Sequence, residues 1–218
     1  MYILMKPQDI SVVWKTKALS FDPIVEWGLV AIFGMSPDTV QRMHLDDADG
    51  TGSMYVNSHT FFRDHLSPGK PLETITGAFV QHMIKDLEAV KRAIREAPGG
   101  KIQVGLMSWI RQRVGIPSTN ALAGEGVVRH DPGILEALSH MDADLFRLSS
   151  GLPKWINKDA HDNVQRLTDA FERGMEPETS IYWAQKRMKM MADRDISSRD
   201  QFAAVMSLWQ ACVSCLLH

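Results

Sequence analysis

Two cysteines near the end of the chain are the first residues whose spacing could do chemistry. Cys212 and Cys215 form a C-x-x-C pair within the last seven residues. Such a pair acts as a redox dithiol at a helix N-terminus that follows a strand, or as half of a zinc site that has further ligands. Neither setting is predicted here, because the pair stands in an apolar stretch with no strand before it. We interpret the spacing as a coincidence, and two clustered cysteines argue against a secreted disulfide scaffold.

A second pair is His59 and Arg63, which lie four residues apart at the start of a helix-like stretch. On a helix this spacing points both side chains to the same side. An arginine in such a position binds a carboxylate through a charge-assisted ion pair, which is bidentate in the best geometry. The alternative is an ordinary solvated face that carries charge. The two residues alone leave both interpretations open.

The sequence predicts no metal site. No two of the eight histidines are four residues apart, so no helix face presents a histidine pair to a metal. The acidic segment "DDADG" invites comparison with a calcium loop. With Gly50 at the sixth position of that loop, however, Leu45 and Val56 occupy the first and twelfth positions, where calcium requires oxygen ligands. The sequence also has no phosphate loop, dinucleotide fingerprint, nucleophile elbow or zinc-protease motif.

The composition is that of an ordinary globular protein. Of the 218 residues, 44% are hydrophobic and 23% are charged, which suits one or two domains with a substantial core. Lys and Arg number 24 against 26 Asp and Glu, so no excess of positive charge indicates nucleic-acid binding. The N-terminal apolar run ends at Lys6 and is too short for a signal peptide or a membrane anchor. The apolar stretch from Phe202 to Leu217 falls short of the ~20 residues that span a bilayer, so a tail anchor is the second choice there.

Helical patterns dominate, strand patterns are few, and the predicted fold class is mainly α. A helix is expected from Asp22 and Pro23 to Gly34, followed by a long loop over residues 36–57. The strongest pattern is an apolar stripe with steps of three and four residues that ends at "APGG" and consists of Leu72, Ile75, Phe79, Met83, Leu87, Val90 and Ile94. Further helices are expected from residue 104 to a stop at Pro117, and over residues 118–122, 131–148, 160–174, 181–195 and 197–218.

Five stretches of the sequence follow one another in an order known from one enzyme family. They are "TKALSFDPIVEWGLVAIFGMSPDTV", "SHTFFRDHLSPGKPLETITGAF", "GLMSWIRQRVGIPSTNALAGEGVV", "DPGILEALSHMDADLFRLSSGLPKWINKDAHDNVQRLTDAF" and "RDQFAAVMSLWQACVS". Their order resembles the cytochrome P450 family of haem-thiolate monooxygenases, in particular fungal members near sterol 7α-hydroxylases and prostacyclin synthase. The fourth stretch resembles the F helix, the loop that ends Gly-Leu-Pro-Lys-Trp and the G helix, and the fifth resembles the start of the I helix. The resemblance implies a single partial P450 domain over residues 1–218, from the B region to the start of the I helix.

The resemblance also implies roles for particular residues. His59 and Arg63 fall where the family's C helix places a Trp-x-x-x-Arg pair that contacts a haem propionate, with His here in place of Trp. Phe33 and Met35 fall in the B–C loop, and Trp155 falls in the F–G region. Both regions face the substrate in the family, so these three residues are expected to be substrate-facing.

Two hallmarks of active family members are missing from the sequence. Haem iron in the family is held by a cysteine thiolate, but neither Cys212 nor Cys215 stands in a Phe-x-x-Gly-x-x-x-Cys-x-Gly setting. No Glu is followed three residues later by Arg, so the Glu-x-x-Arg pair of the K helix is also missing. The N-terminal sheet of the family has no counterpart either. We expect a truncated enzyme that is inactive alone and has no catalytic residue of its own.

Intact relatives imply the wider setting. They use haem to hydroxylate a hydrophobic small molecule such as a terpenoid or sterol, receive electrons from a reductase, and are bound to the endoplasmic-reticulum membrane. This chain is expected not to bind haem productively, and to be cytoplasmic or membrane-associated.

The alternative belongs to a different class: a non-catalytic helical interaction protein that uses the apolar C-terminal helix as its partner-binding face. That helix carries eight large apolar side chains between Phe202 and Leu217. In a truncated enzyme these side chains lack most of their packing partners. We therefore expect an expanded helical state that binds hydrophobic dye.

Overall fold

The computed structural model describes residues 6–16, 19–20, 22–46, 53–55, 64, 66–150, 152–153, 155–175 and 182–217. These residues are mainly helical and contain no β-strand, only an isolated bridge between Asp46 and Ser53, so the mainly α expectation is confirmed. None of the described helices combines the length and the hydropathy needed to cross a bilayer. The helices are α1 (Pro7–Lys15), α2 (Asp22–Ala31), α3 (Pro37–Met43), α5 (Lys70–Glu96), η1 (Pro98–Gly100), α6 (Leu106–Ala123), α7 (Glu125–His130), α8 (Ile134–Ala143), α9 (Leu145–Leu148), α10 (Lys158–Gly174), α11 (Tyr182–Ala192) and α12 (Ser198–Leu217).

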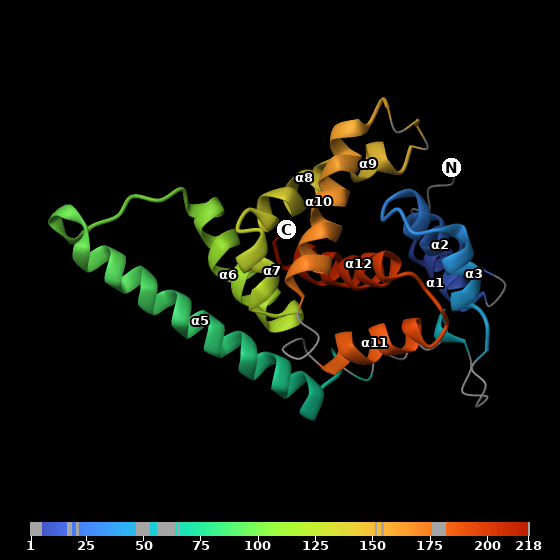
Figure 1. The fold of residues 1–218 in the computed structure, drawn as a ribbon, viewed down its shortest axis with the longest axis horizontal. Helices are drawn as coiled ribbons and strands as arrows, with labels where there is room; N and C mark the ends of the chain where they lie inside the picture. The colour runs from blue at the N-terminus through green and yellow to red at the C-terminus, as the bar shows by residue number, and fades with distance from the viewer. Residues whose placement is uncertain are drawn as a thin grey trace.

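Helix α12 runs through the middle of the molecule and packs against α6, α8, α10 and α11 (Figure 1). The chain has two core clusters, and α12 contributes to both. Its members of the larger cluster are Phe202, Val205, Met206, Trp209 and Val213, and its members of the smaller are Ala203 and Ala204. A helix that is apolar around most of its circumference needs neighbours on several sides. The expectation that α12 lacks packing partners is therefore wrong from Phe202 to Val213.

Helix α10 lies against α12 and also contacts α7 and α8. The rings of Phe171 and Trp209 lie with centroids 5.1 Å apart at an angle of 59°, which is a favourable arrangement for two aromatic side chains. At its C-terminal end α10 comes very close to α7. A Cβ on Gly174 would lie 2.7 Å from both the carbonyl oxygen of Gly126 and the Cα of Val127. The two helices therefore leave no room for a side chain at position 174.

An ion pair fixes the turn between α7 and α8 to α10. The Nε and Nη2 atoms of Arg166 each donate to the carboxylate of Asp131 at 2.7 Å, and the N–H of Gly133 donates to the same group at 2.9 Å. The hydrogen bond from Arg166 is the main reason that the pKa of Asp131 lies below its usual range, against partial burial that raises it.

Residues 36–57, expected as a loop, contain helix α3. The side chain of Ser36 accepts a hydrogen bond from the N–H of Thr39 at 3.0 Å, and Pro37 stands at the first helical position. The carboxylate of Asp200 in α12 accepts from the Thr39 hydroxyl and, at 3.4 Å, from the N–H of Ser36. The loop expectation is wrong over Pro37–Met43, because the Ser-Pro pair caps a helix that α12 holds in place.

Helix α6 continues through Pro117, where the sequence predicts an end. Pro117 is buried inside the helix. The hydroxyl groups of Ser118 and Thr119 donate to the carbonyl oxygens of Val114 and Gly115, at 2.8 Å in both cases. These bonds support the turn in which proline cannot donate. The short helix expected over residues 118–122 is the second half of α6.

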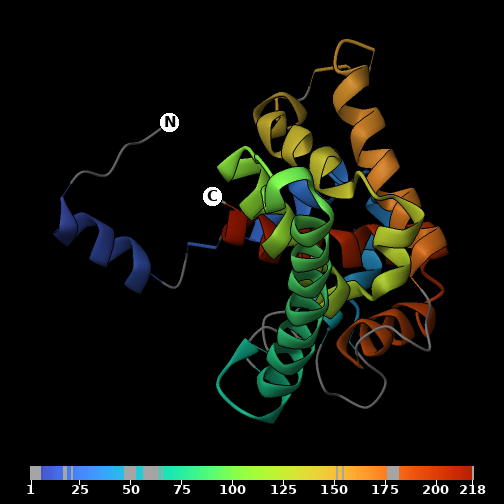
Figure 2. The same cartoon turned by 90° about the vertical axis from the view of Figure 1, so that its left-hand side faces the viewer.

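Helix α5 is confirmed where the apolar stripe predicts it, but none of its residues is buried. Its 27 residues run for about 40 Å at 1.5 Å per residue, and its C-terminal end projects away from the other helices (Figure 1). It is held by ion pairs of Lys85 with Glu125 at 2.9 Å and of Asp86 with Arg113 at 2.5 Å. Helix α1 also stands apart from the body (Figure 2).

The close crossing of α7 and α10 predicts opposite effects at two glycines. Gly174→Ala should lower the free energy of unfolding by about 1–3 kcal/mol, because the added methyl group meets backbone atoms. Gly77→Ala, in α5, is the matched control, since a Cβ there has nothing within 4 Å. Alanine is expected to stabilise that helix by about 0.5–1 kcal/mol. Urea titrations followed by circular dichroism measure both, and equal changes would contradict the crossing.

The stabilising contribution of the Asp131–Arg166 ion pair is expected to depend on pH. Because the pKa of Asp131 is lowered on folding, its contribution is fully present above the unfolded value of about 3.9 and is lost as the pH falls through the folded pKa. Asp131→Asn should lower the free energy of unfolding by about 1 kcal/mol at pH 7 and by less at pH 3. Asp162→Asn, which breaks the exposed pair with Lys158, should change it by less than about 0.5 kcal/mol. An equal loss for Asp131→Asn at both pH values would show that the charge plays no part.

Candidate functional site

His59 and Arg63, the residues of the implied haem contact, lie outside the residues that the structure describes, as does the side chain of Cys215. Cys212 is half-buried on α12, forms no disulfide and packs against the larger core cluster. In the described part of the chain, no three His, Cys, Asp or Glu side chains are placed to hold a metal ion. The roles given to His59 and Arg63 stay predictions.

Phe33 and Met35 lie in the turn that follows α2. Gly34 between them has a φ of +71°, which glycine adopts without strain, and the N–H of Met35 donates to the carbonyl of Leu29 at 3.1 Å. The turn places Met35 in the smaller core cluster, where 2% of its surface is exposed. Phe33 is half-buried and touches both clusters. In this fold Met35 is therefore a core residue, while Phe33 lies at the edge of the core.

Trp155 lies in the connection between α9 and α10, and 79% of its surface is exposed. Phe146 in α9 is 84% exposed, and Leu152 and Ile156 in the same connection are exposed as well. These four side chains, which we call the α9 corner, occupy one end of the molecule. Trp155 is thus exposed in a connection that carries other exposed apolar residues, and it does not lie in the core with Met35.

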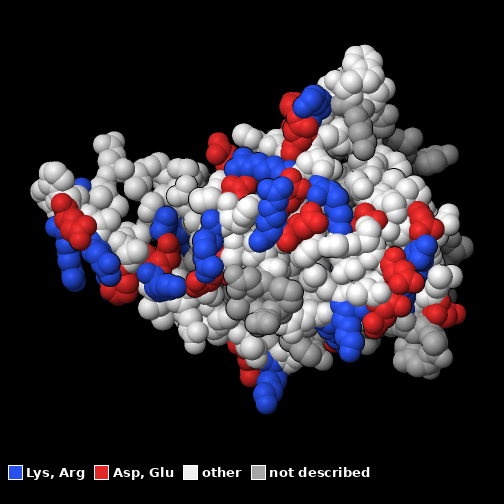
Figure 3. Space-filling view, viewed as in Figure 1, with Lys and Arg blue, Asp and Glu red and all other residues white. Residues whose placement is uncertain are grey.

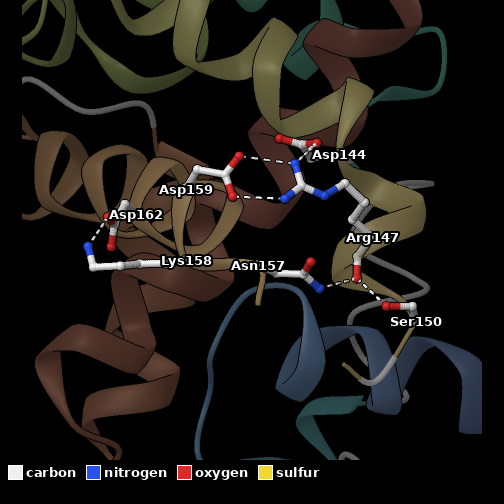
Figure 4. A network of polar contacts seen from close by, with 7 residues as sticks. All are labelled: Asp144, Arg147, Ser150, Asn157, Lys158, Asp159 and Asp162. Atoms are coloured by element: carbon white, nitrogen blue, oxygen red, sulfur yellow. Dashed lines mark hydrogen bonds and ion pairs between the residues drawn. The ribbon is translucent and has the colours of Figure 1, made fainter. Parts of the chain in front are cut away.

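A polar network holds the base of the α9 corner (Figure 4). Arg147 makes a bidentate ion pair with Asp159 of α10, at 2.9 and 3.0 Å, and also donates to Asp144 at 2.8 Å. The carbonyl oxygen of Arg147 accepts hydrogen bonds from the Asn157 amide at 2.9 Å and the Ser150 hydroxyl at 2.6 Å. The hydrogen bond from Arg147 lowers the pKa of Asp159. The network fixes both ends of the connection that presents Trp155.

A hollow of about 270 Å³ lies between the end of α2 and the first half of α10. Its apolar lining comes from Val30, Ala31, Ile32 and Val164, and its polar lining comes from Gly34, Lys158, His161, Asp162 and Gln165. Lys158 and Asp162 form an ion pair with each other at 2.5 Å. A hollow lined by both apolar and polar residues suits the binding of a small, mostly apolar molecule.

The sequence carried a signal for this hollow that motif reasoning missed. Lys158, His161, Asp162 and Gln165 follow helical spacing and therefore share one face of α10. That face is polar, so in isolation it indicates only a solvated side of the helix. It becomes one wall of the hollow because the turn at Gly34 comes back onto it, where Gln165 lies 4.0 Å from an ideal Gly34 Cβ position.

A second cluster of titratable groups surrounds Tyr55. Its hydroxyl donates to the backbone and side-chain oxygens of Asp22 at 3.3 Å, and its ring stacks on His44 with centroids 4.3 Å apart. His44 in turn lies 3.1 Å from Glu26. Burial and the nearby carboxylates, chiefly that of Asp22, raise the pKa of Tyr55. A tyrosine that holds its proton is a hydrogen-bond donor, and here it ties residue 55 to the start of α2.

Charges of both signs are mixed on the face shown in Figure 3. Across the α10–α12 packing, Arg199 contacts Asp169 at 2.8 Å and Glu172 at 3.0 Å. Intermixed charges do not form the single-sign surface that attracts nucleic acid.

Comparison of the chain with protein-family models, with curated proteins and with solved structures finds no match.

Because Met35 is buried and Trp155 is exposed, replacing each by alanine should change the free energy of unfolding by different amounts. Met35→Ala should lower the free energy of unfolding by about 2–5 kcal/mol, as expected for a large buried side chain. Trp155→Ala should change it by less than about 0.5 kcal/mol, because the indole is exposed. Thermal and urea unfolding of the two variants measure this difference. A large loss for Trp155→Ala would mean that the α9 corner packs against something in solution.

Proposed function

We propose that this chain is a helical domain of the haem-thiolate monooxygenase type that binds a small apolar molecule and does not oxidise it. The order of the five sequence stretches and the mainly α fold support the family relationship. The hollow between α2 and α10 is the observation that carries the binding function. It lies beside the turn of Phe33, which the resemblance assigns to a substrate-facing loop.

The proposed function does not include haem chemistry, because no described cysteine stands in a haem-ligating setting. The one described cysteine side chain, Cys212, packs against the core and stands outside the family's cysteine-loop motif. At about 270 Å³ the hollow is also slightly smaller than the ~300–1,000 Å³ that is usual for ligand pockets. A terpenoid of monoterpene size suits this volume better than a sterol.

The interaction-protein alternative needs a surface other than α12. The apolar side chains of α12 from Phe202 to Val213 are mostly covered by α6, α8, α10 and α11. The exposed apolar side chains of the described part lie elsewhere, notably at the α9 corner and on α5 and the start of α6. An interaction function would use those surfaces.

The absence of oxidative chemistry is tested with haem itself. Purified chain mixed with haem, reduced and exposed to carbon monoxide, should show no thiolate-type Soret shift, because no thiolate stands in the ligating motif. The control is the Cys212→Ser variant. A thiolate-type shift in the unaltered chain that disappears in Cys212→Ser would overturn this part of the proposal.

The binding function is tested with geraniol as the probe. Titration of the isotope-labelled full chain should shift the amide resonances of Gly34 and Gln165. Ala31→Phe fills the hollow and should weaken binding at least tenfold, about 1.4 kcal/mol. Ala192→Phe, at an exposed position at the end of α11, is the matched control and should leave binding unchanged. Unshifted resonances, or equal binding to both variants, would sink the proposal.

A further inference from the structure

The projecting end of α5 and the segment that returns from it carry exposed apolar side chains on both sides of a turn. We call residues 84–110 the arm. Its exposed large apolar residues are Ile84, Leu87, Ile102, Val104, Leu106, Met107 and Ile110. Single exposed apolar residues are normal on a protein, whereas a group of this size on one projection marks an interaction surface.

The returning segment of the arm is extended. Lys101 has φ and ψ of −135° and 141°, which are β values, and residues 101–105 are all exposed. Apolar Ile102 and Val104 alternate with polar Lys101 and Gln103, so the segment has the two-residue period of a half-buried strand. No strand of the described residues covers its apolar side.

The backbone of this segment is also unpaired. No backbone–backbone hydrogen bond joins residues 101–104 to any other described residue. An extended segment with free N–H and C=O groups is a template for pairing with another strand. A helix or a bilayer that covered the apolar residues would leave these backbone groups without partners.

The charge of the arm indicates what kind of strand would pair with it. Arg92, Arg95 and Lys101 make no ion pair with any described residue, and Glu96 is the acid among them. Glu88 is already paired with Lys91 at 2.6 Å. Residues 84–110 contain more Lys and Arg than Asp and Glu, so a second copy would repeat this positive charge, whereas a partner with acidic residues would neutralise it.

We infer that the arm binds an extended peptide segment of a partner protein, one that adds a β-strand to residues 101–104 and carries acidic residues between its apolar ones. The partner's alternate apolar side chains cover Ile102 and Val104. Its carboxylates face Arg92, Arg95 and Lys101. This surface is separate from the hollow between α2 and α10, so the inference does not rest on the proposed function.

The test uses the full isotope-labelled chain and three synthetic peptides. EVEVEVE should bind and shift the amide resonances of residues 101–105. KVKVKVK, which keeps the pattern and reverses the charge, should bind at least tenfold more weakly. EVEVEVE with N-methylated valines, which cannot complete the strand hydrogen bonds, should not bind. Equal binding of the methylated peptide would overturn strand pairing.

Two substitutions locate the site. Gln103→Pro removes a backbone donor and keeps both apolar side chains, and Lys101→Glu reverses a charge; each should weaken binding of EVEVEVE at least tenfold. Lys70→Glu, at the other end of α5, is the matched control and should not. If Gln103→Pro loses its helical circular dichroism, the Lys101→Glu result decides. Unchanged affinity in Lys101→Glu overturns the inference. So does a concentration-dependent dimer in sedimentation that Lys101→Glu strengthens, or arm binding to phosphatidylcholine vesicles.

Discussion

The indole of Trp209 lies fully buried where α6, α10 and α12 meet, and the rest of the fold depends on its packing. Its N–H donates to the hydroxyl of Thr119 at 3.1 Å, and its ring packs on Phe171. Thr119 is positioned in turn by its bond to the carbonyl of Gly115. Burial of a large aromatic side chain is strongly favourable, but it is specific only when its polar atom is satisfied. Trp209 thereby fixes the axial position and the rotation of α12 relative to α6 and α10.

Polar contacts along α12 reinforce this register. Asp200 at its start binds α3, and Arg199 binds Asp169 and Glu172 of α10. Nearer its end, Gln210 and Ser214 donate to Asp142 of α8 at 2.9 and 2.7 Å. Apolar burial alone allows a helix to slide or rotate among similar packings, whereas each of these contacts is made at one position only. They explain why so apolar a helix has one place in the fold.

The sequence was sufficient for the type and position of most helices, because periodicity and capping residues are local properties. The stripe from Leu72 to Ile94 predicts α5, and the Asp-Pro start predicts α2. Periodicity does not reveal the partner of a helix, however, so α5 reads as a core helix although none of its residues is buried. For the same reason the sequence predicts α12 to be an uncovered apolar helix, although it packs against α6, α8, α10 and α11. Pro117 misleads because hydroxyl groups from its neighbours and packing on α12 keep α6 intact.

The two candidate sites also differ in how far the sequence could predict them. The hollow between α2 and α10 could not be predicted, because it exists only where the turn at Gly34 meets a polar face of α10. The arm was half visible in the sequence, as a helix stripe and a short alternating segment, but its exposure is a property of the fold. Helix α5, which carries the arm, is tied to the body by its packing on α6, by Ile75, which touches the larger core cluster, and by ion pairs that include those of Lys85 and Asp86.

These contacts limit how strongly binding at the arm can affect the rest of the molecule. Exposed ion pairs contribute about 0–1 kcal/mol each, and allosteric coupling between sites is typically about 1–3 kcal/mol and needs an element with two distinct packings. The connection through Lys85 and Glu125 is exposed, and α5 has no buried residue that could shift the core. A partner bound on the arm therefore changes the order of α5 more readily than it changes α12. The hollow is lined by α2 and α10, and neither helix packs extensively on α5, so we expect the two surfaces to act independently.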